Sequence, residues 1–172
     1  MAIVSKFPQG YGYVVLTGVG SAILLQWMVS RVFNTRRKVK DIEYPGLYHP
    51  GQEKMNCVVR AHQNILEGYP VFLMVLFVGG LQRPKICASA GCVWIVGQVA
   101  YVYGYCSDDK TNRRYGKCIG YLGLLTMFGC TVEFGVRELM HKRLFHTAVG
   151  VKNVMTTKAK GLLPSVLKKQ DR

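Results

Sequence analysis

Long apolar runs separated by short polar segments dominate the chain. Four such runs cover residues 11–33, 65–81, 86–105 and 119–132. Each is near the roughly 20 residues that an α-helix needs to cross a bilayer. Segments such as VVLTGVGSAILLQWMV have almost no polar face, whereas the helices of a water-soluble bundle are amphipathic. The pattern predicts an all-α, integral membrane four-helix bundle rather than a soluble bundle with a buried core.

The connections between the runs are too short for a second folded domain. They extend over residues 34–55, 82–85 and 106–117, and short connections place neighbouring helices antiparallel. We therefore expect one four-span membrane domain over residues 1–140. A basic tail over residues 141–172, broken by glycine and proline, is expected to lie at the membrane surface.

The formal net charge of +14 comes from basic residues that bracket the apolar runs. This distribution is typical of membrane topology and contact with anionic lipid headgroups, and it argues against nucleic acid as a partner. Lys and Arg gather in the first and third connections, which places both on the cytosolic side. The basic residues of the tail favour the opposite orientation.

The six cysteines show no CxxC pair and no Cys/His spacing suited to a metal ion. Several lie inside apolar runs, where cysteine behaves as a small hydrophobic residue. We therefore predict no metal site and no disulfide scaffold. Gly116 and Gly120 have the small-xxx-small spacing that lets helix backbones approach closely in lipid, as do Gly18 and Ala22.

Polar residues in the stretch RAHQNILEGYP precede the second apolar run. On a helix, Arg60, Asn64 and Glu67 fall on one narrow stripe, while His62 points nearly the opposite way. Ionisable groups at membrane depth are costly and face a partner, a cavity or a ligand. An Arg60–Glu67 structural pair is one explanation, and a zwitterionic ligand bound by the same groups is the other.

Further polar residues are expected at the same end of an antiparallel bundle. Tyr101 and Tyr105 are four residues apart and therefore share one helical face. Four arginines flank the apolar runs at this end: Arg36, Arg37, Arg113 and Arg114. A polyanionic, partly apolar ligand suits such a site.

These motifs together resemble a known family. RAHQN followed by LE and YP, the upstream EYP at residues 43–45 and the downstream YVYGY at residues 101–105 are similar to motifs of the MAPEG superfamily, the membrane-associated proteins in eicosanoid and glutathione metabolism. The likeness extends from Val4 to about Gly123 and is greatest to the microsomal glutathione transferase 3 branch.

The resemblance implies a homotrimer of four-helix subunits that binds glutathione, as a co-substrate and without a metal, between neighbouring subunits. The positions matching its glutathione contacts are Arg36, Arg60, His62, Asn64, Glu67, Tyr101 and Tyr105. Arg113 matches the arginine that stabilises the glutathione thiolate, and Arg37 matches an arginine that handles the lipid substrate. The loop before Arg113 is one residue longer than in leukotriene C4 synthase, so Arg114 is the alternative catalytic arginine.

The implied activity is transfer of glutathione to lipid electrophiles such as epoxides and glutathione-dependent reduction of lipid hydroperoxides. Leukotriene C4 synthase activity is a further candidate. The implied location is the endoplasmic reticulum membrane, with the outer mitochondrial membrane as the alternative. A non-enzymatic lipid-binding partner, like five-lipoxygenase-activating protein, would have the same architecture. Glu133 lies in the last span without an assigned role, and helical spacing predicts a pair with Arg137.

Overall fold

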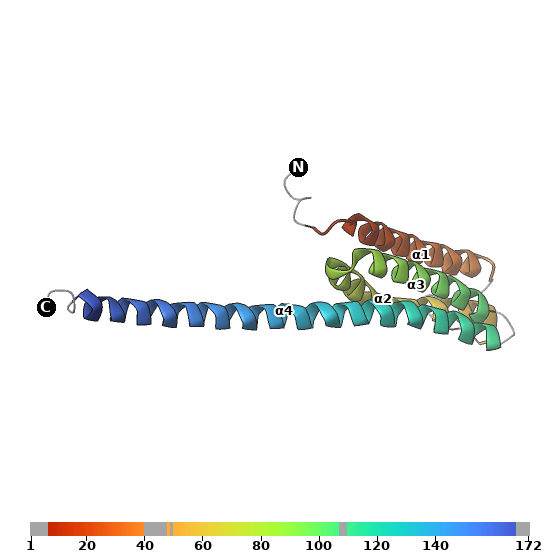
Figure 1. Ribbon diagram of the computed structural model, residues 1–172. Coiled ribbons are helices and arrows are strands. Elements are labelled where there is room, and N and C mark those ends of the chain that lie inside the picture. Colours follow the sequence, from red (N-terminus) through yellow and green to blue (C-terminus); the bar gives the residue numbers. More distant parts are fainter. Residues whose placement is uncertain (1–6, 40–47, 49, 107–109, 168–172) are drawn as a thin grey trace. The chain divides into compact units, whose positions relative to one another are not determined.

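The computed structural model describes residues 7–39, 48, 50–106 and 110–167, and in the last segment it describes the side chains of residues 114–142. The described residues form four helices, which Figure 1 labels in chain order. They are α1 (Tyr11–Arg37), α2 (Glu53–Gln82), α3 (Pro84–Tyr105) and α4 (Lys110–Leu167).

All four helices contain a segment long and apolar enough to cross a membrane, which confirms the predicted all-α membrane architecture. In α4 this segment is Arg114–Lys142. Each helix extends beyond its apolar run, and α2 begins at Glu53, well before its apolar run at residues 65–81. Polar residues of good helix propensity continue the helix where hydropathy falls, so the RAHQN block lies inside α2.

The chain divides into two compact units, Met1–Phe134 and Gly135–Arg172. The first unit holds α1, α2, α3 and the first part of α4. In the second unit α4 continues to Leu167. The part of the predicted tail that the structure describes is therefore helical, and Gly161 and Pro164 both lie within this helix.

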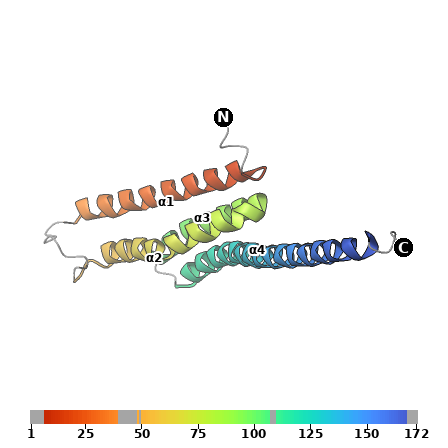
Figure 2. The same cartoon turned by 90° about the vertical axis from the view of Figure 1, so that its left-hand side faces the viewer.

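In the first unit, α1, α2 and α3 each pack against the other two (Figure 2). The core between them contains Phe72 of α2, whose ring stacks on Trp94 of α3 with centroids 3.9 Å apart. Val75 and Leu76 of α2 and Met127 of α4 are fully buried around this pair. Close packing of these side chains holds the helices together, because burial from water does not drive helix association inside a bilayer.

Glycines bring α4 into close contact with α3. A Cβ added at Gly116 would overlap the backbone of Tyr101, and one added at Gly97 would overlap the backbone of Gly120. The small-xxx-small spacing of Gly116 and Gly120 therefore marks a true helix contact, as predicted. The same contact fixes Tyr101 relative to the start of α4.

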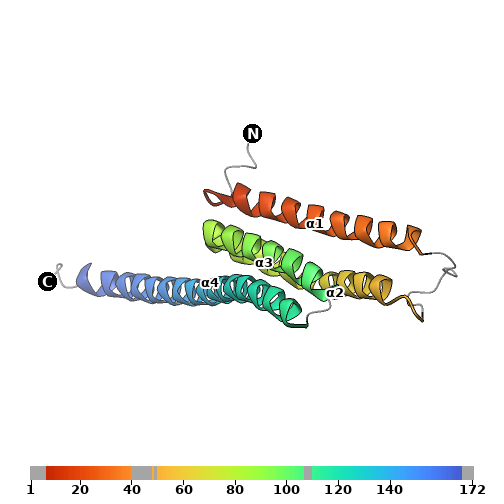
Figure 3. The same ribbon diagram turned by 90° about the vertical axis from the view of Figure 1, so that its right-hand side faces the viewer.

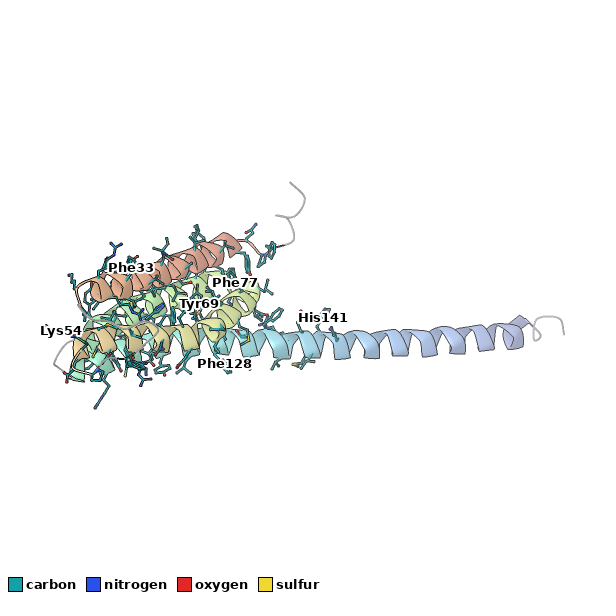
Figure 4. All side chains as sticks on the ribbon, turned by 180° about the vertical axis from the view of Figure 1, so that it is seen from behind. Phe33, Lys54, Tyr69, Phe77, Phe128 and His141 are labelled. Atoms are coloured by element: carbon teal, nitrogen blue, oxygen red, sulfur yellow. The ribbon has the colours of Figure 1, made fainter. Side chains whose placement is uncertain are left out.

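The antiparallel order brings the segments that carry the predicted site residues together at one end of the first unit. At this end, which we call the site end, α1 and α3 finish and α2 and α4 begin (Figure 3). Figure 4 shows Phe33 of α1 and Lys54 of α2 there, with Phe77 of α2 farther along the bundle. We call the other end, where α1 and α3 begin and α2 finishes, the opposite end.

Glu133 has a partner at the opposite end that helical spacing did not predict. Arg83, between α2 and α3, donates hydrogen bonds from Nε to Oε2 and from Nη2 to Oε1 of Glu133, each 2.8 Å long. The hydrogen bonds, and then the attraction of the carboxylate charge, raise the pKa of the Arg83 guanidinium. This two-point contact links α4 to the turn between α2 and α3.

Candidate functional site

A polar pocket of about 530 Å³ opens at the site end of the first unit, between α2, α3 and α4. We call it the site pocket. Its described lining residues are Asn64, Tyr101, Tyr105, Arg114, Lys117, Cys118 and Tyr121. A smaller recess of about 80 Å³ shares Asn64 and Tyr101 with it and continues toward Trp94 and Leu124. A polar pocket thus leads into a more apolar recess inside the bundle.

A hydrogen bond between α2 and α3 organises the site pocket. Asn64 Nδ2 donates to the Tyr101 hydroxyl over 2.7 Å. Tyr101 is 2% exposed, and its ring lies 5.4 Å from that of Tyr105 at 58°. The structure therefore brings together three of the residues that the sequence predicted to bind glutathione. Burial fixes Tyr101, so its hydroxyl has a defined position for a ligand.

Two cations from α4 face this group. Arg114 lines the pocket, and Lys117 Nζ lies 5.5 Å from the centre of the Tyr101 ring, within the range of a cation–π interaction. The described lining contains no carboxylate. The pocket therefore favours an anionic ligand. The side chain of Arg113, the predicted catalytic arginine, lies outside the described residues, and its backbone belongs to α4.

Arg60 and Glu67 of α2 lie outside the lining of the site pocket in a single chain. Both are exposed, and the Arg60 guanidinium lies 5.0 Å from the centre of the Tyr48 ring. Among the described residues no ion pair joins Arg60 to Glu67, so the structural-pair explanation fails. Their positions are seven residues apart, which corresponds to a rise of about 10.5 Å along the helix axis.

Arg36, Arg37 and His62 are likewise absent from the described lining of the site pocket. The Arg37 guanidinium lies 4.4 Å from the centre of the Phe33 ring. His62 Nδ1 is buried and has no hydrogen-bond partner within the described part of the chain. One chain therefore places Asn64, Tyr101 and Tyr105 in one pocket and directs the other predicted contacts elsewhere.

Three pocket residues of α4 were missed by the sequence analysis: Lys117, Cys118 and Tyr121. Helical spacing could have found them, because they lie three, four and seven residues after Arg114 and share one face with it. Lys117 was instead treated as the end of a connection. The helix already begins at Lys110, so Lys117 is two turns inside it and faces α3.

Comparison with known proteins identifies the family to which this chain belongs. The sequence profile of the MAPEG family matches residues 14–132 of the chain. The chain belongs to the MAPEG family. The match covers residues 14–33 of the first apolar run, the other three runs in full and every residue of the site pocket, so the pocket is a feature of the MAPEG part of the chain.

Individual relatives match a shorter stretch. Human microsomal glutathione S-transferase 2 is 33% identical over 81 residues, which cover 46% of this chain and 55% of the human protein. The bovine protein of the same name is 31% identical over 46% of this chain and 56% of its own length. The uncharacterized protein sll1147 of Synechocystis is 32% identical over 45% of this chain and 56% of its own length. The matches thus span about half the length of these relatives.

Proposed function

We propose that this MAPEG protein is a membrane glutathione transferase. The observation that supports this most is the site pocket, where the Asn64–Tyr101 hydrogen bond faces the cations Arg114 and Lys117. Glutathione carries carboxylates and an ionisable thiol, which such a cationic pocket would bind as anions. Two of the similar proteins are named microsomal glutathione S-transferase 2, which supports the same co-substrate.

The chemistry depends on the thiolate. A free thiol has a pKa near 8.5 and is mostly protonated at neutral pH, and a guanidinium beside it favours the nucleophilic thiolate. We propose Arg113 for this role, with Arg114 as the alternative because it lines the site pocket. The thiolate sulfur forms a bond to an electrophilic carbon. If that carbon belongs to an epoxide, its carbon–oxygen bond breaks and the oxygen takes a proton from water.

The same thiolate would reduce a lipid hydroperoxide. The sulfur attacks the terminal oxygen, the oxygen–oxygen bond breaks, and the lipid alkoxide is protonated to an alcohol. The sulfenic acid of glutathione then reacts with a second glutathione to give the disulfide and water. Arg37 would stabilise the departing oxygen in either reaction. We likewise propose peroxidase activity, leukotriene C4 synthase activity and location in the endoplasmic reticulum membrane.

We further propose that the working form is a homotrimer with glutathione bound between subunits. The stripe of Arg60 and Glu67 lies outside the site pocket of its own chain, as does His62, whose Nδ1 is buried without a described partner. Because His62 points nearly opposite to Arg60 and Glu67, α2 of one subunit would contact two different glutathione molecules in such a trimer. Chemical crosslinking in mild detergent should stop at trimers, and active monomers would contradict the proposal.

A comparison of two single variants tests the arginine mechanism. If Arg113 stabilises the thiolate, Arg113→Ala should lose conjugation rate at neutral pH far more than glutathione affinity, because Asn64 and Tyr101 still bind the tripeptide. Raising the pH should restore part of the rate, since hydroxide then deprotonates the bound thiol. The measurements are a pH series with a small electrophile and the thiolate absorbance of bound glutathione.

The matched control is Arg114→Ala, which removes the same charge one residue farther along α4. If only this control shows the pH rescue, Arg114 is the catalytic arginine. If neither variant changes turnover or thiolate absorbance, the arginine mechanism is wrong. A folded wild-type protein that binds lipid but shows no turnover would instead support a non-enzymatic lipid-binding role.

A further inference from the structure

A second hollow lies away from the site pocket, between α1 and α3 and toward the opposite end of the first unit. This groove has a volume of about 570 Å³. It is lined by Tyr13, Leu16, Thr17, Gly20, Lys85, Ala88, Ser89, Cys92 and Ile95. It shares no residue with the site pocket. The two hollows are therefore separate.

Small residues create the groove, and the hydroxyl groups of Thr17 and Ser89 in its walls are already hydrogen-bonded. A Cβ added at Gly20 would lie 3.7 Å from Ile95 Cδ1, so the glycine leaves space where a side chain would pack. Thr17 Oγ1 donates to the Tyr13 carbonyl oxygen over 2.8 Å, and Ser89 Oγ donates to the Ile86 carbonyl oxygen over 2.9 Å. Hydroxyls bonded to their own helices do not require a polar ligand, so the walls suit a hydrocarbon chain.

One end of the groove is positively charged. Lys85 lies in the first turn of α3, and its Cγ would be 3.9 Å from a Cβ at Gly10, next to the start of α1. Its charge is exposed, and no described residue forms an ion pair with it, whereas the nearby Arg83 is paired with Glu133. The described lining of the groove contains no carboxylate. The start of α1 and of α3 at this end adds the positive end of two helix dipoles.

The length of the groove matches one leaflet of a bilayer. From Lys85 to Ile95 the α3 axis rises about 15 Å, which is half of the roughly 30 Å hydrocarbon core. The charged end lies where the spans of α1 and α3 begin, at the level of the headgroups. Tyr13 is 60% exposed at the same level, where amphipathic rings favour the interface.

We propose that this groove binds an anionic phospholipid. One acyl chain lies between α1 and α3 along Leu16, Gly20 and Ile95, and the phosphate contacts the Lys85 ammonium. The apolar walls of the groove suit an acyl chain, and the Lys85 ammonium at the headgroup end favours a lipid with a net negative charge. This site does not depend on the proposed transferase activity, because none of its residues lines the site pocket.

Native mass spectrometry of the full-length protein in detergent tests the proposal, with phosphatidylglycerol and phosphatidylcholine as probes. The wild type should bind phosphatidylglycerol about five-fold more tightly, as expected for one lysine near an anionic headgroup. Lys85→Gln should abolish this preference. Ser89→Leu, which fills the groove, should weaken both lipids. Lys54→Gln, at the site end, and Val96→Leu, on an exposed part of α3 outside the lining, are the matched controls and should retain wild-type binding.

Alkylation of Cys92 gives a second readout in the unaltered protein. Cys92 is exposed in the groove, and Cys118 is exposed in the site pocket. Added phosphatidylglycerol should slow maleimide labelling of Cys92 and leave the labelling rate of Cys118 unchanged. Both rates are measured on peptides from the labelled protein. The proposal fails if Lys85→Gln keeps the preference, or if Cys92 gains no protection from lipid. Protection of Cys92 in lipid-free oligomers would also overturn it, because a second copy of the chain would then cover the groove.

Discussion

Gly116→Ala should destabilise the bundle at the contact that positions the site pocket. An added Cβ would overlap the backbone N and Cα of Tyr101 and the carbonyl carbon of Ala100. Backbone atoms inside a helix cannot rotate away as a side chain can, so α4 must move from α3. Arg114 and Lys117 flank Gly116, and their distance from Tyr101 would increase with that movement.

The magnitude follows from two opposing effects. Overpacking of a closely packed contact costs about 1–3 kcal/mol, and a backbone overlap belongs at the upper end, near 3 kcal/mol. Replacing glycine by alanine inside a helix returns about 1 kcal/mol. The net loss should therefore be roughly 2 kcal/mol. Gly129→Ala, in the same helix, meets nothing within 4 Å of the added Cβ and should gain about 1 kcal/mol.

The comparison between these two variants isolates the steric cost, because both gain the same helix propensity. The predicted difference of about 3 kcal/mol corresponds to roughly 6–12 °C between their thermal midpoints, at 2–4 °C per kcal/mol. Unfolding in detergent can be followed by the fluorescence of Trp94, which is buried against Phe72 in the core. Conjugation activity should fall only in Gly116→Ala. Equal midpoints would refute the close approach of α3 and α4.

Two further predictions concern single contacts. In a double-mutant cycle, Asn64→Ala and Tyr101→Phe should each weaken glutathione binding, with a coupling of about 0.5–1.5 kcal/mol from their 2.7 Å hydrogen bond; strictly additive effects in calorimetry would contradict a shared role. Burial, and then the nearby Cys57, raise the pKa of the Cys106 thiol, while Arg31 opposes them, so alkylation of Cys106 should require a higher pH in the folded protein than in the denatured chain. Arg31→Gln should shift the pH dependence of Cys106 alkylation to still higher pH. An unchanged pH dependence, measured by peptide mass spectrometry, would show that Arg31 does not influence the Cys106 thiol.

The fold was predictable because a membrane allows an apolar chain segment of this length to cross it only as an α-helix when the chain shows this pattern. Backbone groups in hydrocarbon must bond within their own segment, so an apolar run such as residues 86–105 becomes a helix, here α3 (Pro84–Tyr105). Hydropathy alone does not set the helix ends, which explains the early start of α2 at Glu53. The Arg83–Glu133 pair was missed for another reason. Its partners are 50 residues apart, and local spacing reports only neighbours on one helix.

The candidate site also depended partly on local sequence spacing, which could be predicted, and partly on long-range packing, which could not. Periodicity placed Tyr101 and Tyr105 on one face of α3, and the structure places both in the site pocket. Periodicity could not give the rotation of α2 against α3, which directs Asn64 toward Tyr101 and leaves Glu67 exposed on the same helix. A charged residue that faces away from its own pocket at membrane depth needs another partner. In the proposed homotrimer, Glu67 is therefore the residue of α2 whose environment we expect to change most on assembly.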